Sequence, residues 1–298
     1  MRPEIGIVTV LYNSDDVIDD FFASLARQRG VDFKLYVIDN SPTPSGLDRC
    51  RELARQLDIA SELVFNNANV GVARGNNQGI ELALRDGCSH VLLSNNDTEF
   101  PAGTLTELLR AVKDGEQVAT PKILYYGAEN LIWYAGGRID EWTMRTPHIG
   151  QLAPDRGQFD VAGHTPYAPT CFLLMRSEVF RQVGMMDERY FVYYDDTDFV
   201  WRLGRQGISI RYVPTAIVRH KVSTSTGGKT SPFTVYYTNR NRIYFIRKNL
   251  RGLRRLGALG YALLTRLPNT VGLPWPDAKR LWAGVKEGLA LPVNADAR

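Results

Sequence analysis

The sequence predicts an α/β fold built on a mostly parallel sheet, and three observations indicate it. Short β-branched runs alternate with segments that carry apolar residues at helical spacing. Each of the β-branched runs ends at a polar turn, an arrangement typical of parallel strands joined by crossover helices. The chain has 298 residues, which is enough to bury one large α/β core, with or without an appendage.

Three strands are expected in the first 65 residues. They are Ile5–Leu11, Phe33–Ile38 and Ser61–Phe65, separated by helices over Asp15–Arg27 and Leu47–Leu57. Pro42 and Pro44 prevent the second strand from continuing. Ligands of such sheets bind beyond the carboxyl ends of the strands, where Asn13, Asp39 and the loop after the third strand lie.

A loop rich in asparagine and glycine follows the third strand. It runs from Asn66 to Gly79, and a helix is expected behind it over Ile80–Arg85. Asparagine and glycine tolerate left-handed backbone, and asparagine side chains such as Asn69 and Asn76 offer short amide groups. Arg74 adds a cation, so the loop suits a diphosphate and a ribose. A plain turn is the alternative on local sequence.

A second polar turn ends the buried strand expected over His90–Leu93. Its sequence is Ser94-Asn95-Asn96-Asp97-Thr98. An Asn-x-Asp at the exposed end of a central strand can hold a divalent cation through oxygen ligands, and that cation would also bridge phosphates. The alternative is an Asx-turn that leads into a helix over Gly103–Val112.

Beyond Pro121 the pattern changes to short strands and irregular segments. Strands are expected over Lys122–Tyr126, Leu131–Ala135, Arg138–Ile139, Thr170–Met175 and Ile208–Val213. The stretch Glu141–Gly163 is polar and irregular, and Ser177–Val183 is a short helix that ends at Gly184. Ser223–Thr230 is a loop of the kind that closes over a ligand.

The stretch from Met185 to Leu203 carries the strongest indication of chemistry. Three carboxylates, Asp195, Asp196 and Asp198, lie within a run of aromatic residues. Aromatic walls and neighbouring like charges raise a carboxyl pKa, which suits a general base that works near neutral pH. The alternative is an ordinary helix over Phe199–Arg205, with Asp196 or Thr197 as its N-cap.

The carboxyl-terminal part of the chain differs in kind. No acid interrupts its basic residues between Thr238 and Arg255, which are Arg240, Arg242, Arg247, Lys248, Arg251, Arg254 and Arg255. Apolar residues interleave at roughly helical spacing, so a basic amphipathic helix is expected that suits an anionic membrane surface. The alternative is a helix packed on the main domain with a solvated basic face. Nucleic acid is disfavoured because no recognition module accompanies these residues.

Composition and cysteine usage favour a cytoplasmic protein. The net charge of +4 is modest, and the three cysteines are widely spaced, which indicates reduced thiols. No signal-peptide core is expected at the amino terminus, and no apolar run approaches the ~20 residues of a membrane span. We therefore expect a cytoplasmic protein that associates peripherally with the inner face of the cytoplasmic membrane.

Taken in chain order, these motifs resemble those of the family-2 glycosyltransferases, inverting enzymes with the GT-A fold. The motifs are TVLYNS, VIDNS, NxNVGxAxGNNxG, LLSNND, an acidic cluster before WRL, and an isolated histidine followed by Ser/Thr. The resemblance covers residues 5 to 249. The segment Tyr237-x-x-Arg240-Asn241-Arg242 looks like the branch that adds rhamnose to bacterial cell-surface glycans.

The resemblance implies a role for each motif. Tyr12, Asn13 and Asp39 would hold the nucleotide base, and Arg74 and Asn76 would lie near the ribose and diphosphate. Asp97 and His220 would hold Mg²⁺ or Mn²⁺, and Asp196, beside Asp195, would be the catalytic base. The remaining expected substrate-binding residues are Asn69, Asn95, Asn96, Trp201 and Arg240. Asn95 stands where the family's metal motif usually begins with aspartate.

The expected protein is therefore an inverting glycosyltransferase. Its expected substrates are a nucleotide-sugar donor, best dTDP-rhamnose, and a hydroxyl of a cell-surface glycan or lipid-linked acceptor. A galactofuranosyl- or other hexosyl-transferase is the first alternative. A sugar-nucleotidyltransferase and a non-catalytic nucleotide-sugar binding protein are more distant ones. The expected GT-A domain covers residues 1–242, with a nucleotide-sugar half (1–120) and an acceptor half (121–242), and residues 243–298 form the membrane-associating segment.

Overall fold

The structure is a computed structural model that describes residues 2–128, 130–221 and 231–293, apart from the side chain of residue 269. Its strands are β1 (Ile5–Leu11), β2 (Phe33–Asp39), β3 (Ser61–Phe65), β4 (His90–Ser94), β5 (Thr98–Glu99), β6 (Val118–Tyr125), β7 (Ile132–Tyr134), β8 (Gly163–Thr165), β9 (Phe172–Arg176) and β10 (Ile210–His220). They form one sheet in the order β3-β2-β1-β4-β9-β6-β10-β5, with β7 beside β6 and β8 beside β10.

Parallel pairing organises the amino-terminal half of this sheet. Strands β3, β2, β1 and β4 are all parallel, as the alternation of strands and helices predicts. Strand β9 enters antiparallel between β4 and β6, and β5 closes the far edge antiparallel to β10. The predicted bounds of β1 and β3 are confirmed.

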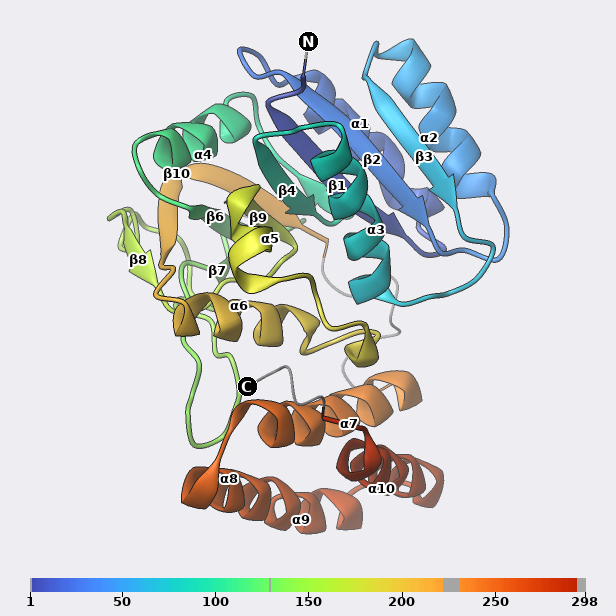
Figure 1. Ribbon diagram of the computed structural model, residues 1–298, viewed down its shortest axis with the longest axis vertical. Helices are drawn as coiled ribbons and strands as arrows, with labels where there is room; N and C mark the ends of the chain where they lie inside the picture. Colours follow the sequence, from blue (N-terminus) through green and yellow to red (C-terminus); the bar gives the residue numbers. More distant parts are fainter. Residues whose placement is uncertain (1, 129, 222–230, 294–298) are drawn as a thin grey trace.

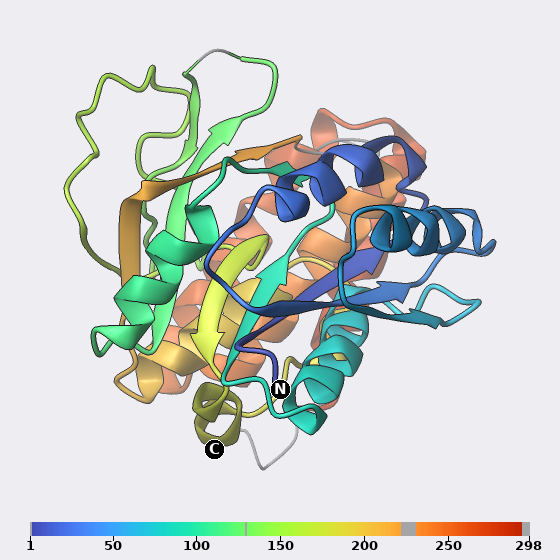
Figure 2. The same ribbon diagram turned by 90° about the horizontal axis from the view of Figure 1, so that it is seen from above.

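Ten α-helices lie within the described residues. They are α1 (Ile18–Ala26), α2 (Ser45–Gln56), α3 (Val72–Arg85), α4 (Thr104–Lys113), α5 (Glu178–Val183), α6 (Asp195–Arg205), α7 (Pro232–Asn249), α8 (Gly252–Leu264), α9 (Arg266–Val271) and α10 (Trp275–Ala290). Helices α1 and α2 cover one face of the parallel strands and α3 covers the other (Figure 2). Helix α6 lies beneath the sheet, with α7 and then α8 to α10 below it (Figure 1).

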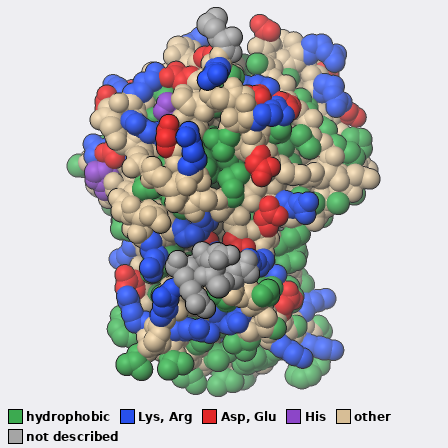
Figure 3. All heavy atoms as spheres, in the orientation of Figure 1, with side chains coloured by type: hydrophobic (Ala, Val, Ile, Leu, Met, Phe, Trp, Pro, Cys, Tyr) green, Lys and Arg blue, Asp and Glu red, His purple; other side chains and the backbone are tan. Residues whose placement is uncertain are grey.

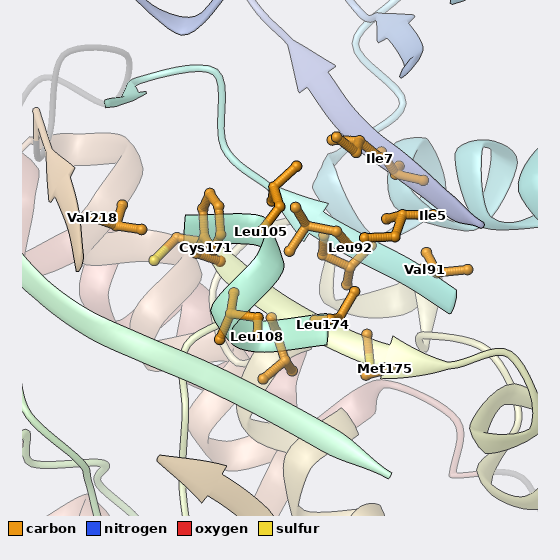
Figure 4. Close-up of a cluster of buried hydrophobic side chains, with 14 of the residues drawn as sticks. Ile5, Ile7, Val91, Leu92, Leu105, Leu108, Cys171, Leu174, Met175 and Val218 are labelled. Atoms are coloured by element: carbon orange, nitrogen blue, oxygen red, sulfur yellow. The ribbon is translucent and has the colours of Figure 1, made fainter. Parts of the chain in front are cut away.

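The main hydrophobic core fills the space between the central strands and their helices. Figure 4 shows side chains from several elements meeting there, among them Ile7 on β1, Leu92 on β4, Leu174 on β9 and Leu108 on α4. Each of these four residues is at most 1% exposed. This continuous core holds the strand ends, and therefore the polar turns that follow them, in fixed relative positions.

Helix α3 begins at Val72, eight residues before the predicted start at Ile80, so the asparagine-rich loop is shorter than expected. The reason is its glycines, which the sequence interpretation took for loop residues. A Cβ on Gly75 would lie 2.9 Å from the Val10 side chain, and one on Gly79 would clash with Val8. These glycines therefore let the helix pack closely on β1 instead of interrupting it.

The carboxyl-terminal helices form a second, smaller core. It contains Tyr190 before α6, Phe245 on α7, Ala262 on α8 and Leu281 on α10. Helix α10 approaches α7 closely because Gly284 and Gly288 face the α7 backbone, where a side chain would clash. The predicted domain division stays a prediction, and its boundary at residue 242 lies inside α7.

The expected basic amphipathic helix is not a single helix. The chain leaves helical geometry at Leu250 and Arg251, so the basic run is divided between α7 and α8. Lys248 also has acidic partners, since its ammonium lies 2.8 Å from carboxylate oxygens of both Asp187 and Asp198. Part of the predicted membrane face is therefore packed against Asp187 and Asp198 instead of facing solvent.

Two other predictions need correction. Arg138–Ile139 is not a strand, because only isolated bridges form at the residues on either side of it. Helix α6 starts at Asp195 with Tyr194 as its N-cap, whereas the sequence interpretation gave a start near Phe199 with Asp196 or Thr197 as the cap. The predicted closing loop Ser223–Thr230 lies outside the described residues. No helix in the described part of the chain is long and apolar enough to cross a membrane.

Candidate functional site

The carboxyl ends of the first three strands meet in register. Leu11 at the end of β1 pairs with Asp39, which pairs with Phe65 at the end of β3. Asp39 is fully buried, and its Oδ1 accepts a hydrogen bond of 2.8 Å from the Ser41 amide. Its Oδ2 has no partner among the described residues. A buried acceptor left open at this edge fits the predicted role of binding a donor group, such as an N–H of a nucleotide base.

Two other predicted nucleotide ligands adjoin Asp39. The backbone amide of Asn13 donates to the hydroxyl of Ser41 (2.9 Å), and Asn13 has left-handed backbone with φ 49°. The Tyr12 ring is 37% exposed, so it is accessible for stacking. The sheet thus brings Tyr12, Asn13 and Asp39 together.

The polar residues around Gly71 are used in two ways. Asn66 exchanges hydrogen bonds with Gln78 and donates to Asn40, a network that holds the turn between β3 and α3. The residues predicted to bind the ribose and diphosphate make fewer hydrogen bonds within the protein. Asn69 only accepts from the Gly71 amide (3.1 Å), Asn76 is buried on α3, and Arg74 is exposed. The Arg74 guanidinium lies 4.0 Å from the Glu188 carboxylate.

Asp97 and His220 are 123 positions apart in sequence and adjacent in space. Antiparallel pairing of β5 with β10 places His220 opposite Thr98. The His220 Nε2 lies 3.1 Å from the Asp97 Oδ1, and both residues are buried. Burial acts to raise the pKa of Asp97, but its interactions with His220 and with nearby hydrogen-bond donors together outweigh burial, so the pKa lies below its usual value. The carboxylate is therefore ionised at neutral pH.

This pair fits a divalent cation in two respects. Within the described part of the chain the Asp97 Oδ1 makes no well-aligned hydrogen bond, and its nearest polar neighbour is the His220 Nε2 at 3.1 Å, although buried polar atoms normally have a partner. Two ligands at ~2.1 Å from one octahedral ion lie ~3 Å apart, close to the observed separation. No group of three or more acidic, histidine or cysteine side chains that could hold a metal occurs among the described residues. Any ion held by this pair would need further ligands from a substrate, as Mg²⁺ commonly does.

The neighbouring residues Asn95 and Asn96 differ. Asn95 is exposed, whereas Asn96 is buried and its side-chain nitrogen has no partner among the described residues. The hydroxyl of Thr98 donates to the Asn95 carbonyl (2.7 Å), so the turn is closed as the Asx-type alternative expects. A closed turn and a cation site are compatible here, because the Asp97 side chain takes no part in that hydrogen bond.

The acidic cluster begins α6 on a strained backbone. Phe191, Tyr193 and Tyr194 all have positive φ, between 63° and 66°, which is rare for aromatic residues. Asp196 is partly buried at the first turn of the helix. Its Oδ2 accepts a hydrogen bond of 2.5 Å from the Tyr167 hydroxyl, and its Oδ1 accepts one of 2.6 Å from the Thr197 amide.

Asp195 and Asp196 have different environments. Burial and the adjacent charge of Asp196 raise the pKa of Asp195 to about 8. Asp195 therefore keeps its proton at neutral pH and is poorly suited to accept another. Asp196 is oriented by two donors and is less buried, so it is the better candidate for a general base.

Asp198 is fully buried and has four donors. They are the Tyr190 hydroxyl (3.0 Å), the Arg202 Nε (3.0 Å), the Lys248 ammonium (2.8 Å) and the Asn249 amide (2.9 Å). A carboxylate with this many partners has no free lone pair to offer a substrate. The geometry gives Asp198 the role of an anchor between α6 and α7.

Sequence reasoning missed an aromatic row between the two acidic groups. Trp133 meets both His220 and His148 edge to face, with ring centroids 4.8 and 4.5 Å apart respectively. His148 stacks on Tyr167, whose hydroxyl reaches Asp196. Trp133 lies on β7, but His148 lies in the segment interpreted as a polar insertion and Tyr167 just beyond it. No local pattern in the sequence singles these residues out.

The structure does not bring Trp201 and Arg240 to the other predicted ligands. The Trp201 ring packs edge to face on Phe245 in the second core, with centroids 5.9 Å apart. The Arg240 guanidinium is bonded to the Glu287 carboxylate (2.8 Å) and to the Arg189 carbonyl (2.8 Å). The substrate-binding roles of these two residues stay predictions.

Comparison with known proteins places this chain in a family. The model of the family described as glycosyl transferase family 2 matches residues 6–184. A low-salt glycan biosynthesis hexosyltransferase, Agl10 of Haloferax volcanii, is 24% identical, covering 90% of this chain and 82% of that protein. A dTDP-rhamnosyl transferase, RfbF of Shigella flexneri, is 23% identical, covering 84% and 82%. An N-acetylglucosaminyl-diphospho-decaprenol L-rhamnosyltransferase of Mycobacterium tuberculosis is 26% identical, covering 76% and 79%.

A solved structure supports the fold. The crystal structure of GalNAc-T7 with UDP, GalNAc and Mn²⁺ superposes with a TM-score of 0.68 at 14% sequence identity. The superposition covers 96% of this chain, which spans about half (54%) of the length of that structure. The chain therefore has the GT-A architecture that the sequence motifs imply.

Proposed function

This chain belongs to glycosyl transferase family 2, and from that membership we propose that it is an inverting rhamnosyltransferase that uses dTDP-rhamnose. Its acceptor is a hydroxyl of a cell-surface glycan or a lipid-linked sugar. One observation carries the mechanism. Asp196 and the Asp97–His220 pair stand at opposite ends of the row formed by Trp133, His148 and Tyr167.

In this mechanism Asp196 accepts the proton of the acceptor hydroxyl as the oxygen attacks the anomeric carbon. A new carbon–oxygen bond forms on one face while the bond to the diphosphate oxygen breaks on the other, so the configuration is inverted. A positioned base typically contributes ~10²–10⁴ in rate. The Tyr167 hydroxyl and the Thr197 backbone amide donate to the Asp196 carboxylate and hold its orientation during the transfer.

The leaving diphosphate is placed at the other end of the row. Asp97 and His220 would hold Mg²⁺ or Mn²⁺, which supplies charge neutralisation for the departing diphosphate. Support comes from the 3.1 Å separation of the Asp97 Oδ1 and the His220 Nε2, which suits two ligands of one ion, and from the lack of a well-aligned hydrogen bond to that oxygen in the described residues. Tyr12, Asn13 and Asp39 receive the base, with Asn69, Arg74 and Asn76 near the ribose and diphosphate.

Rhamnose is favoured because two of the three relatives are named as rhamnosyl transferases. A hexosyltransferase is the second candidate, because the relative from Haloferax volcanii carries that name. The relative from Mycobacterium tuberculosis is named for a diphospho-decaprenol acceptor, which supports a lipid-linked acceptor here. Such acceptors place the enzyme peripherally at the inner face of the cytoplasmic membrane.

The test is a panel of nucleotide sugars, with slow donor hydrolysis followed by nucleotide release, with and without EDTA. We expect dTDP-rhamnose to be hydrolysed fastest. We also expect Asp97→Ala to weaken nucleoside diphosphate binding ~10-fold in Mn²⁺ and to have no effect in EDTA. Hydrolysis of only a hexose donor would replace rhamnose by that hexose. Equal weakening of binding with and without metal would make Asp97 a structural turn residue.

A further inference from the structure

The end of the molecule farthest from the sheet is apolar. Of the nineteen exposed large hydrophobic side chains in the described residues, ten lie between positions 253 and 293. Figure 3 shows hydrophobic side chains gathered at the lower end of the molecule, over α8, α9 and α10. We refer to six of these residues as the apolar tip: Leu253, Leu256, Leu264, Leu267, Val271 and Trp275, which are 55–89% exposed.

Helix α8 is apolar on both faces. Its inner face places Ala258 and Ala262 in the second core, as expected for a packed helix. Its outer face, which is normally polar on a surface helix, carries Leu253, Leu256 and Leu264. A contiguous apolar surface of this kind marks an interaction site.

Basic residues accompany the tip and have few acidic neighbours. The exposed or partly exposed cations of this unit are Arg251, Arg254, Arg255, Lys279, Arg280 and Lys286. The sequence between residues 250 and 293 contains only two acids, Asp277 and Glu287. Glu287 is bonded to Arg240, Asp277 lies 3.3 Å from Arg280, and Arg254 pairs with Glu141. Arg251, Arg255, Lys279 and Lys286 have no acidic partner among the described residues, so the surface around the apolar tip is positive.

We propose that the apolar tip docks on an anionic lipid bilayer, in the interfacial plane. This inference deepens the proposed function and rests on it only for the source of the acceptor. Apolar side chains inserted ~5–10 Å and a cationic surround are what such binding requires, and a tryptophan such as Trp275 suits the headgroup region. A second copy of the chain fits less well, because two positive surfaces would face each other.

The surface differs from the one that the sequence predicts. In the structure Arg247 donates to the carbonyls of Gly288 and Leu291, and Lys248 pairs with Asp187 and Asp198. These two cations hold α7 in place and are not available to lipid headgroups. The helices that contact the bilayer are therefore α8, α9 and the start of α10. Helix α7 lies between them and α6 (Figure 1).

The test is sedimentation of the full chain with vesicles of phosphatidylglycerol and phosphatidylcholine. We expect the double variant Leu264→Ser/Trp275→Ser to lower the partition coefficient at least ~10-fold. The matched control is Trp142→Ser/Val161→Ser, because both control residues are 81% exposed, outside the tip. The control should sediment as the wild type does. Equal sedimentation of the tip variant and the wild type would overturn the proposal.

A second experiment distinguishes docking on anionic lipid from docking on a second copy of the chain. Arg251→Glu/Lys279→Glu should reduce binding to anionic vesicles, and vesicles of phosphatidylcholine alone should bind the wild type weakly. If the wild type is a dimer in solution that the tip variant turns into monomers, the tip is an interface between copies. Donor hydrolysis without lipid should be unchanged in every variant. Failure of the proposed function would remove this hydrolysis from the wild type, while sedimentation would still report on docking.

Discussion

The two acidic regions of the site are held in place by different kinds of structure. Asp97 and His220 are brought together by the pairing of β5 with β10, at the edge of a sheet with a continuous core. Asp195 and Asp196 follow a segment of positive φ at the start of α6, outside the sheet. The first region depends on sheet pairing, and the second needs contacts from elsewhere to maintain its backbone.

Those contacts come from α7. The side-chain amide of Asn241 donates to the carbonyls of Tyr190 (2.8 Å), Val192 (2.6 Å) and Tyr193 (2.9 Å). One residue earlier, Arg240 donates to the carbonyl of Arg189. Further along the helix, Lys248 and Asn249 bind Asp198. Helix α7 therefore acts on the proposed base through the segment before α6, whereas in the described residues it makes no such bond to the Asp97–His220 pair.

This difference gives Arg240 and Asn241 a positioning role. The family resemblance suggests Arg240 as a ligand of the substrate, but the side chains of Arg240 and Asn241 both donate to backbone carbonyls of the segment before α6. The same helix carries the second core and packs on α10. Substitutions in the carboxyl-terminal helices should therefore affect sugar transfer, which uses Asp196, more than they affect nucleotide binding.

The largest expected effect is that of Asp196→Asn. The amide is nearly isosteric but does not accept the proton, so sugar transfer should fall by at least ~10², which corresponds to ~2.7 kcal/mol in the barrier. Nucleoside diphosphate binding, which depends on the other region, should be unchanged. The measurements are transfer rates and nucleotide titrations on the same preparation.

Asp198→Asn is the matched control for that variant. It leaves Arg202 without its buried counter-charge and Lys248 with Asp187 alone, so stability should fall by ~3–5 kcal/mol while the remaining folded protein still transfers sugar. Near wild-type transfer by Asp196→Asn, together with its loss in Asp195→Asn, would move the base to Asp195.

A smaller effect is expected for Asn241→Ala. Three carbonyls lose their donor, so the segment before α6 should relax, with a stability loss of ~2 kcal/mol and transfer lowered ~10-fold. Asn239→Ala is the control, since the Asn239 amide bonds only to Val235 within α7. Its transfer rate should match the wild type. If Asn241→Ala weakened nucleotide binding as much as it slowed transfer, the two regions would not be independent.

Sequence predicted the strand ends of the sheet for a physical reason. The strands β1 and β3 are local β-branched runs, and parallel pairing alone brings Asp39 and Asn13 to one edge. The expectation that Asp97 meets His220 required a family resemblance, because no local pattern links residues so distant in sequence. The choice of Asp196 within the acidic cluster rests on the same resemblance and stays a prediction.

The contacts of the second region could not be predicted locally. Lys248 appeared to be a free cation because its partners Asp187 and Asp198 are 50 or more positions away. The strained backbone at Tyr193 and Tyr194 has no signature in the side chains, since aromatic residues normally avoid positive φ. The early start of α3 was missed because close packing on β1 overrode the low helix propensity of glycine.

The last prediction concerns the pH dependence of stability at Asp195. Its pKa is raised to about 8 in the folded protein, while an unfolded aspartate has a pKa near 3.9. Well below pH 4 both states hold the proton, so Asp195 makes no contribution to the pH dependence of stability. As the pH rises toward 8, the unfolded state releases its proton but the folded state retains it. The free energy of unfolding therefore falls, by up to ~1.4 kcal/mol per pH unit.

Asp195→Asn removes this proton from both states, so its free energy of unfolding should depend less on pH between 5 and 7 than that of the wild type. The measurement is urea unfolding of both proteins at pH 5, 6 and 7. The stability of the variant relative to the wild type should increase with pH. Parallel curves would mean that Asp195 is ionised in the folded protein. In that case both carboxylates could accept a proton, and the distinction between Asp195 and Asp196 as the base would rest on the Tyr167 hydrogen bond alone.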